Sequence, residues 1–188
     1  MPSLSTTYLI TGTLRGTGLE MMHRLLDGGA MVIAACRNLV KATNLCRLQE
    51  SGLAQGRLRI VQLDVTDDVS ITDTIKVVAE PHPRGIDVLI HNTGIADVKG
   101  YSKLLDHGRQ TILHNINTNV VSPVIITQYF LPLLKTPSAD KQLILMVASS
   151  SGVAEVYGIS KVAVNKMFAE LAIDLKDRDI TVAGIHPG

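Results

Sequence analysis

Short runs of apolar residues recur along the chain, and longer segments of mixed polarity separate them. Six such runs are rich in β-branched and aliphatic residues, at positions 7–11, 30–35, 58–63, 86–91, 142–148 and 180–185. Each run is apolar almost without interruption, which is typical of strands that are covered on both faces, as in a parallel sheet. The pattern therefore predicts six strands of a buried parallel sheet.

The segments between these runs predict helices over 17–28, 39–51, 69–79, within 103–135 and over 157–176. In the last segment, apolar side chains recur mainly at helical spacings, at Val162, Met167, Phe168, Leu171 and Leu175. Alternation of strand and helix is the signature of right-handed βαβ crossovers. We therefore predict an α/β chain with one domain over 1–188, a three-layer doubly wound Rossmann fold.

Composition narrows the possible partners and compartments. With 188 residues, 46% of them hydrophobic, the chain is long enough to bury one substantial core. A net charge of +1 without long charged runs argues against a nucleic-acid partner. The start has no signal-peptide pattern and no apolar run spans a bilayer, so we expect a soluble cytoplasmic protein without membrane contact. Cys36 and Cys46 are expected to be buried or half-buried thiols, and no metal site is expected.

A glycine-rich turn follows the first predicted strand and leads directly into a helix. It contains Gly12, Leu14, Arg15, Gly16 and Gly18. Glycines at these places allow a tight turn and let backbone N–H groups and the helix N-terminus approach a pyrophosphate. A turn without a ligand is the alternative, but the strand before and the helix after favour a dinucleotide.

The end of the second predicted strand bears on which dinucleotide binds. It reads Ala35-Cys36-Arg37-Asn38 and has no carboxylate to hold the ribose 2′-hydroxyl of NAD. Arg37 and Arg15 together favour the 2′-phosphate of NADP(H), because guanidinium groups pair well with phosphate. The alternative is that both are solvated surface arginines.

At this point the chain resembles the short-chain dehydrogenase/reductase family. The glycine spacing is similar to that family's TGxxxGxG turn, and further landmarks follow in the family's order over nearly the whole chain. They are Asp64-Val65, His91-Asn92-Thr93-Gly94, Asn119, a serine after the fifth strand, Tyr157-x-x-x-Lys161 and Pro187-Gly188. Within the family, the chain looks similar to fungal ketoreductases and to C-factor-like carbonyl reductases.

The resemblance implies cofactor contacts position by position. Asp64 would hold the adenine amino group and Val65 would pack near the ring, while Asp67 or Asp68 would cap the following helix. Where the family usually has NNAG, this chain has His91 and Thr93, and we give His91 no catalytic role. The implied cofactor-binding set is Gly12, Leu14, Arg15, Gly16, Gly18, Arg37, Asp64, Val65, Asn92, Gly94, Tyr157, Lys161, Pro187 and Gly188.

The catalytic set implied by the family is Asn119, Ser149, Tyr157 and Lys161. Lys161 lies four residues after Tyr157, on the same helical face, where its ammonium can stabilise a phenolate. Ser149 would orient a substrate carbonyl, and Ser150 is its nearest rival, because a slip of one residue exchanges strand facings. Among three nearby asparagines, Asn119 best matches the family residue that anchors a water in the proton relay. Asn115 and Asn117 are expected to be helix-surface or kink residues.

The predicted function is NADPH-dependent reduction of a small ketone or aldehyde to an alcohol, with Tyr157 as the acid and base. Two departures leave alternatives open. The gap from Ser149 to Tyr157 is shorter than usual for the family, and the sequence stops at Pro187-Gly188, before the family's substrate-covering segment and last strand. The alternatives are a cofactor-binding protein without redox turnover, including an isomerase or cyclase, and an inactive truncated product. The family also implies a homodimer or homotetramer through the helices of Asn119 and Tyr157.

Overall fold

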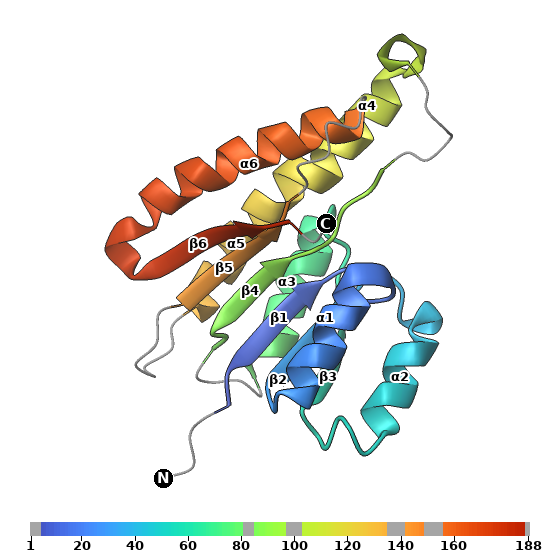
Figure 1. Ribbon diagram of the computed structural model, residues 1–188, viewed down its shortest axis with the longest axis vertical. Helices are drawn as coiled ribbons and strands as arrows, with labels where there is room; N and C mark the ends of the chain where they lie inside the picture. The colour runs from blue at the N-terminus through green and yellow to red at the C-terminus, as the bar shows by residue number, and fades with distance from the viewer. Residues whose placement is uncertain (1–4, 81–84, 97–102, 135–141, 149–155, 187–188) are drawn as a thin grey trace.

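The computed structural model describes residues 5–80, 85–96, 103–134, 142–148 and 156–186. In these ranges the chain forms six strands, β1 (Thr7–Thr11), β2 (Met31–Cys36), β3 (Leu58–Gln62), β4 (Val88–His91), β5 (Gln142–Val147) and β6 (Ile180–Ile185). They make one parallel sheet in the order β3-β2-β1-β4-β5-β6 (Figure 1). The prediction of a six-stranded parallel sheet is confirmed.

The direction of the winding reverses between β1 and β4. From β1 the chain moves outward to β2 and β3, then returns to place β4 on the other side of β1, with Ile10 level with Ile90. In doubly wound sheets, ligands bind beyond the carboxyl ends of the strands at such a reversal. The ends of β1 and β4 are therefore where the sheet itself positions a site.

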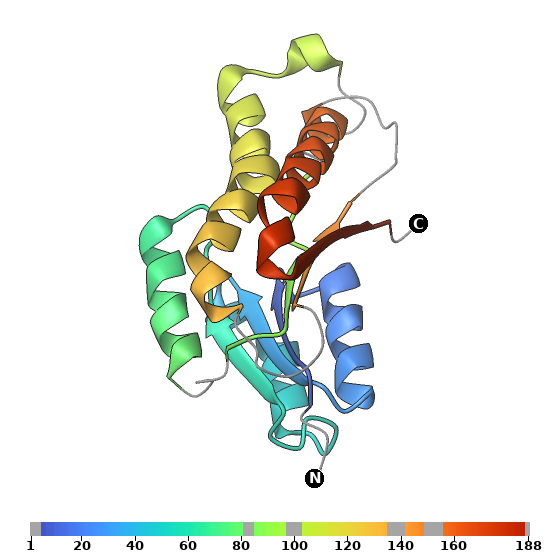
Figure 2. The ribbon, with the colours of Figure 1, turned by 90° about the vertical axis from the view of Figure 1, so that its left-hand side faces the viewer.

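Helices cover both faces of the sheet (Figure 2). The helices α1 (Gly16–Asp27) and α2 (Thr43–Glu50) pack on one face, and α3 (Asp68–Ala79), α5 (Ser122–Phe130) and α6 (Val156–Asp174) pack on the other. The helix α4 (Arg109–Ile116) precedes α5 and contacts α6. Among the described residues, no helix combines the length and the apolar composition needed to span a membrane.

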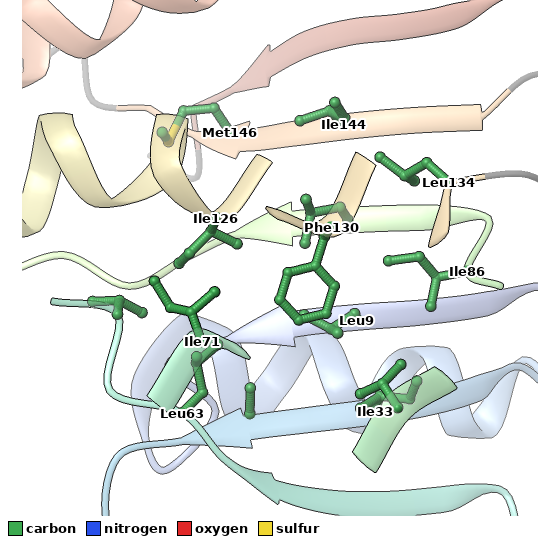
Figure 3. Close-up of a cluster of buried hydrophobic side chains, with 14 of the residues drawn as sticks. Leu9, Ile33, Leu63, Ile71, Ile86, Ile126, Phe130, Leu134, Ile144 and Met146 are labelled. Carbon is green, nitrogen blue, oxygen red and sulfur yellow. The ribbon is translucent and has the colours of Figure 1, made fainter. Parts of the chain in front are cut away.

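Two apolar clusters lie on the two faces of the sheet, and successive strand residues alternate between them. Leu9 belongs to the cluster that contains Phe130 and Ile126 of α5 (Figure 3), whereas Ile10 belongs to the cluster under α1 and α2. Because both faces are covered, both sets of strand residues must be apolar. This is the physical reason for the uninterrupted apolar runs in the sequence.

The long helical segment within 103–135 is divided by a π turn over Asn117–Val121, between α4 and α5. Pro123 has no N–H to donate, and its ring would clash with the carbonyl of Asn119 in an unbroken α-helix. The helix accommodates Pro123 with a wider turn, in which the backbone N–H and the hydroxyl of Ser122 both donate to the carbonyl of Asn117, the hydroxyl at 2.8 Å. This turn determines where Asn119 points.

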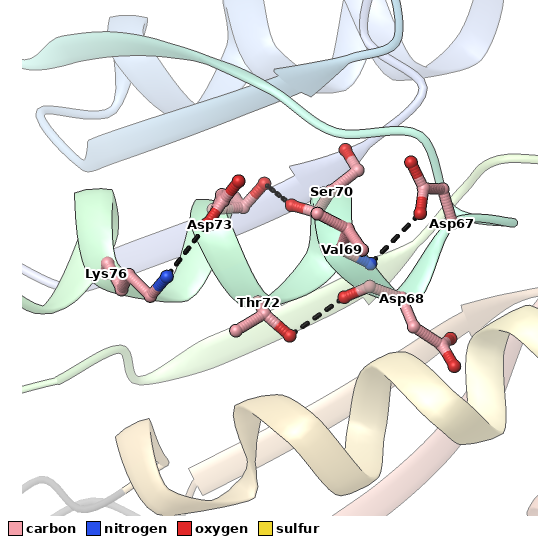
Figure 4. Close-up of polar contacts among 8 residues, drawn as sticks. Asp67, Asp68, Val69, Ser70, Thr72, Asp73 and Lys76 are labelled. Carbon is pink, nitrogen blue, oxygen red and sulfur yellow. Dashed lines mark hydrogen bonds and ion pairs between the residues drawn. The ribbon is translucent and has the colours of Figure 1, made fainter.

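Other helix boundaries differ from the prediction for local reasons. The segment 39–51 begins with a 3-10 helix (Leu39–Lys41), because the Asn38 side chain accepts from the N–H groups of Val40 and Lys41, and α2 starts only at Thr43. Asp67 caps α3 as predicted, accepting from the N–H of Val69 at 3.0 Å (Figure 4).

One expected core residue is on the surface. The spacing predicts Val162 on the buried stripe of the last helix, but its side chain is 73% exposed. Phe168 and Leu175 of the same pattern are buried as expected. The helix α6 is apolar on more than one face, so that periodicity alone assigns the wrong face to Val162.

Candidate active site

The glycine turn after β1 is attached to the end of β2. The carbonyl oxygen of Ala35 accepts from the N–H of Gly12 at 3.0 Å, from the N–H of Thr13 at 3.3 Å and from the Thr13 hydroxyl at 3.2 Å. Gly12 has a φ of +74° and Gly16 of +61°, values that favour glycine. These hydrogen bonds fix the glycine turn at the carboxyl edge of the sheet.

Asn92, directly after β4, fastens the same turn from the other side. Its side-chain nitrogen donates to the carbonyls of Thr11 at 3.0 Å and Gly12 at 2.9 Å. The hydroxyl of Thr11 in turn accepts from the N–H groups of Asn92 and Thr93, both at 3.1 Å. Sequence reasoning missed the anchoring roles of Thr11 and Thr13, because a threonine at a strand end carries no distinctive motif.

The first turn of α1 fits the phosphate groups of a dinucleotide. Within the described part of the chain, no side chain caps this turn, and no acidic residue lies in it. Its first backbone N–H groups therefore lack intrahelical acceptors and point, with the positive end of the helix dipole, at the turn. Such an end is a suitable place for a pyrophosphate.

A cavity of about 470 Å³ extends from this turn across the ends of β2, β3 and β4. Nine of the predicted cofactor residues line it, namely Gly12, Leu14, Arg15, Gly16, Arg37, Asp64, Val65, Asn92 and Gly94. Gly18 lies beneath the cavity, where a Cβ atom would stand 2.4 Å from the side-chain nitrogen of Asn92. The residues chosen from sequence for cofactor contact are thus brought to one place by the fold.

The described residues that line the cavity include more arginines than carboxylates. Arg15 and Arg37 are exposed at its rim, and Asp64 is the single carboxylate among the described residues that line it. One oxygen of Asp64 accepts from the N–H of Thr66 at 3.0 Å and from its hydroxyl at 2.7 Å. Asp64 is therefore held in a local turn and does not pair with either arginine.

Two further residues of the cavity wall, His114 and Thr118, come from α4 and the π turn. Thr118 is 4% exposed, and its hydroxyl has no hydrogen-bond partner among the described residues. No sequence motif marks these positions, because only the packing of α4 against the sheet edge brings them to the cavity.

Lys161 and Tyr157 lie near the beginning of α6. The Lys161 side chain is buried, its ammonium donates to the carbonyl of Val147 at 2.9 Å, and it lies 5.6 Å from the centre of the Tyr157 ring. A Cβ atom on Gly94 would be 3.6 Å from the same nitrogen. Burial lowers the pKa of the Lys161 ammonium. The ammonium thus stands between the ends of β4 and β5, next to the cavity wall.

Asn119 occupies the π turn and bonds to the segment that follows β4. Its side-chain oxygen accepts from the N–H of Ile95 and its nitrogen donates to the carbonyl of Ile95, both at 2.8 Å. The nitrogen also donates to the hydroxyl of Ser160 at 2.9 Å. Of the two alternatives for Asn115 and Asn117, a helix surface or a kink, Asn117 is exposed and begins the π turn. Asn115 is not on the surface, since it is 1% exposed and donates to the carbonyl of Thr111, but it lies in α4 just before that turn.

His91 is a packed residue at the end of β4. It lies 2.9 Å from the hydroxyl of Thr127, which itself donates to the carbonyl of Pro123 at 2.8 Å. Because the hydroxyl has only one proton, the Nε2 atom of His91 must be the donor in the first bond. The ring also meets Phe168 edge-on at 5.5 Å, and complete burial lowers the pKa of His91 to about 3.

Four of the predicted site residues, Ser149, its rival Ser150, Pro187 and Gly188, lie outside the described residues. Of the two free cysteines, Cys36 is buried and lines the cavity, whereas Cys46 is exposed, contrary to expectation.

Comparisons with known proteins agree with this geometry. A family model described as short chain dehydrogenase matches residues 6–188. An uncharacterized oxidoreductase of Schizosaccharomyces pombe is 31% identical over 196 residues, covering 100% of this chain and 75% of the yeast protein. A short-chain dehydrogenase of Pyricularia oryzae is 30% identical over 201 residues, covering 99% and 77%.

Among solved structures, the NADPH-bound carbonyl reductase from chicken fatty liver matches with a TM-score of 0.88 and 26% identity, covering 99% of this chain and 77% of that one. The fold, the glycine turn, the order of landmarks and the matched family model lead to one conclusion. The chain belongs to the short-chain dehydrogenase family, a family of oxidoreductases that bind a nicotinamide cofactor.

Proposed function

We propose that this protein is an NADPH-dependent reductase that converts a small ketone or aldehyde to an alcohol. The observation that carries the proposal is the pair Tyr157 and Lys161, with the ammonium 5.6 Å from the centre of the phenol ring. The same ammonium lies beside Gly94, which lines a cavity suited to a dinucleotide. A phenol beside an ammonium can release a proton and remain as a stabilised phenolate, which is what reduction of a carbonyl requires.

Each residue of the candidate site has its own role in the proposed reduction. NADPH, when bound, supplies the hydride. Tyr157 donates its phenolic proton to the carbonyl oxygen as negative charge develops there, and Lys161 stabilises the phenolate. Ser149, or its rival Ser150, would donate a hydrogen bond to the same oxygen. Asn119 holds the wall of the cavity at Ile95.

The preference for NADPH over NADH rests on the two arginines at the rim of the cavity. Arg37 follows β2 and Arg15 precedes α1, and no carboxylate at the end of β2 is present to hold a free ribose hydroxyl. Charge-assisted hydrogen bonds from guanidinium groups to a 2′-phosphate favour the phosphorylated cofactor. The NADPH-bound carbonyl reductase from chicken fatty liver, a structural relative, supports the same choice.

Cofactor titration tests this preference. We expect Arg37→Ala to weaken NADPH binding about tenfold while changing NADH binding less than twofold, because only NADPH carries the 2′-phosphate. Arg47→Ala, a change at an exposed arginine on α2, is the control and should alter neither affinity. Equal affinity of the unmodified protein for both cofactors would contradict the proposal.

A carbonyl panel tests turnover. The protein should oxidise NADPH in the presence of at least one ketone or aldehyde, and Tyr157→Phe should abolish this activity, because it removes the proton donor. Tyr129→Phe, at a partly exposed tyrosine on α5, should leave the rate unchanged. NADPH that binds but stays unoxidised across the panel would refute the reductase. A product formed without net NADPH consumption, and insensitive to Tyr157→Phe, would instead favour an isomerase or cyclase.

We also propose that the protein forms a homodimer through the outer surface of α4, α5 and α6. This surface exposes the apolar side chains Ile112, Leu113, Val121, Tyr129, Ile159 and Val162. Exposed apolar side chains on neighbouring helices favour an interaction site. Light scattering should show a dimer that Val162→Lys converts to a monomer, whereas Val69→Lys, at a similarly exposed valine on α3, should remain dimeric. A monomeric unmodified protein would contradict the proposal.

A further inference from the structure

A chain of hydrogen bonds connects the cavity wall to the helix that carries Tyr157. It runs from the backbone of Ile95 through the side chain of Asn119 to the hydroxyl of Ser160, with bonds of 2.8 and 2.9 Å. The Ser160 hydroxyl then donates to the carbonyl oxygen of Tyr157 at 2.6 Å. Ile95 lines the dinucleotide cavity, so the chain joins the two halves of the candidate site.

Among the described residues, Ser160 provides the hydrogen bond that links Asn119 to α6, and its hydroxyl both donates and accepts. Its side chain is 0% exposed, its proton goes to the Tyr157 carbonyl, and its lone pair accepts from Asn119. Asn119 likewise uses both amide protons, one on Ile95 and one on Ser160. Neither side chain has a proton left for another role, so each has one orientation that satisfies its neighbours.

We infer that Ser160 is a positioning residue, which holds the first turn of α6, and with it Tyr157, in register with the cavity wall at Ile95. The expected effect of Ser160 on turnover rests on the proposed function. Its expected effect on the position of the first turn of α6 does not depend on turnover. Loss of the hydroxyl removes the side-chain bond to the Tyr157 carbonyl and leaves one amide proton of Asn119 without an acceptor. The first turn of α6 then loses its hydrogen bond to the π turn, and the phenol is held less firmly relative to a bound cofactor and substrate.

The test compares Ser160→Ala with Ser51→Ala. Ser51 makes the same local bond, donating to the carbonyl of Leu48 three residues earlier at 2.6 Å, but it lies at the end of α2 and does not line the cavity. We expect Ser160→Ala to lower kcat about tenfold while the NADPH dissociation constant changes less than twofold, because Ser160 does not line the cavity. Ser51→Ala should leave both quantities unchanged.

A double variant tests whether Asn119 and Ser160 act together in this chain of hydrogen bonds. Asn119→Ala combined with Ser160→Ala should lower kcat no further than the more damaging single change, because either change alone breaks the same connection. Losses that multiply would show that the two residues act independently and would overturn the inference.

Hydrogen exchange of the peptide that covers the start of α6 tests, without any assay of turnover, whether Ser160 holds the first turn of α6 in place. Exchange there should accelerate in Ser160→Ala and stay unchanged in Ser51→Ala. If the unmodified protein reduces no carbonyl, the proposed function fails, yet accelerated exchange still supports the positioning role. Unchanged exchange in Ser160→Ala overturns that role whatever the activity.

Discussion

Asn92 lies so close to Gly18 that only glycine fits at position 18. A Cβ atom there would stand 2.4 Å from the side-chain nitrogen of Asn92 and 2.5 Å from the carbonyl oxygen of Gly12. The same nitrogen donates to that carbonyl at 2.9 Å, so neither group can move without breaking the tie between β1 and β4. The third glycine of the turn is therefore a packing requirement between α1 and the residue that directly follows β4.

Replacement of Gly18 by alanine should therefore destabilise the protein by about 2 kcal/mol and greatly weaken cofactor binding, because the first turn of α1 must shift. Gly52→Ala is the control, since nothing lies within 4 Å of a Cβ atom there, and its effect should stay within about 0.5 kcal/mol. Urea unfolding and NADPH titration measure the two effects. A Gly18→Ala protein with unchanged stability and affinity would disprove this packing.

The stability of the protein should fall as the pH falls below 6.5 because of His91. Burial lowers the pKa of His91 to about 3, whereas the unfolded chain has an ordinary histidine pKa near 6.5. Between these values the unfolded state binds a proton that the folded state does not, so acid favours unfolding. From pH 7 to pH 5 this one group should lower the free energy of unfolding by about 2 kcal/mol.

Urea unfolding at the two pH values measures this loss. His91→Gln should show a loss about 2 kcal/mol smaller than the unmodified protein, since glutamine does not titrate. His23→Gln, on α1, should keep the full pH dependence. Identical pH dependence in His91→Gln and the unmodified protein would be incompatible with a buried neutral imidazole.

Two buried threonines should respond in opposite ways to the same substitution. Thr127 accepts from His91 and donates to Pro123, so Thr127→Val leaves a buried imidazole proton unpaired and should cost about 1–3 kcal/mol. The hydroxyl of Thr118 has no partner among the described residues, so Thr118→Val should be neutral or stabilising without cofactor. Thermal and urea unfolding compare the pair. A larger loss at Thr118 than at Thr127 would contradict the hydrogen-bond assignment.

Asn119 and Asn117 should differ sharply although they lie two residues apart. Asn119→Ala removes three hydrogen bonds to Ile95 and Ser160 and should cost about 2–4 kcal/mol, with loss of turnover. Asn117→Ala changes an exposed side chain and should stay within about 0.5 kcal/mol. Chemical unfolding of both variants measures the difference, and equal small effects would refute the tie between the π turn and Ile95.

Much of the candidate site was predictable because its residues follow strand ends in a fixed order. Apolar runs locate the strands, and parallel strands bring their carboxyl ends to one edge, so Gly12, Arg37, Asp64 and Asn92 meet in one cavity. By contrast, His114, Thr118 and Ser160 carry no motif. They contribute through the way α4, the π turn and α6 pack, which a linear pattern does not contain.

The hydrophobic periods of the chain by themselves determined six buried parallel strands and the helices between them, because a strand covered on both faces must be apolar at every position. Residue order also determined which side chains reach the carboxyl edge. Tertiary structure alone decided the exposed position of Val162 and the burial of Asn115. Each of these depends on contacts between distant segments, and such contacts, unlike periodicity, exist only when the helices pack on the sheet.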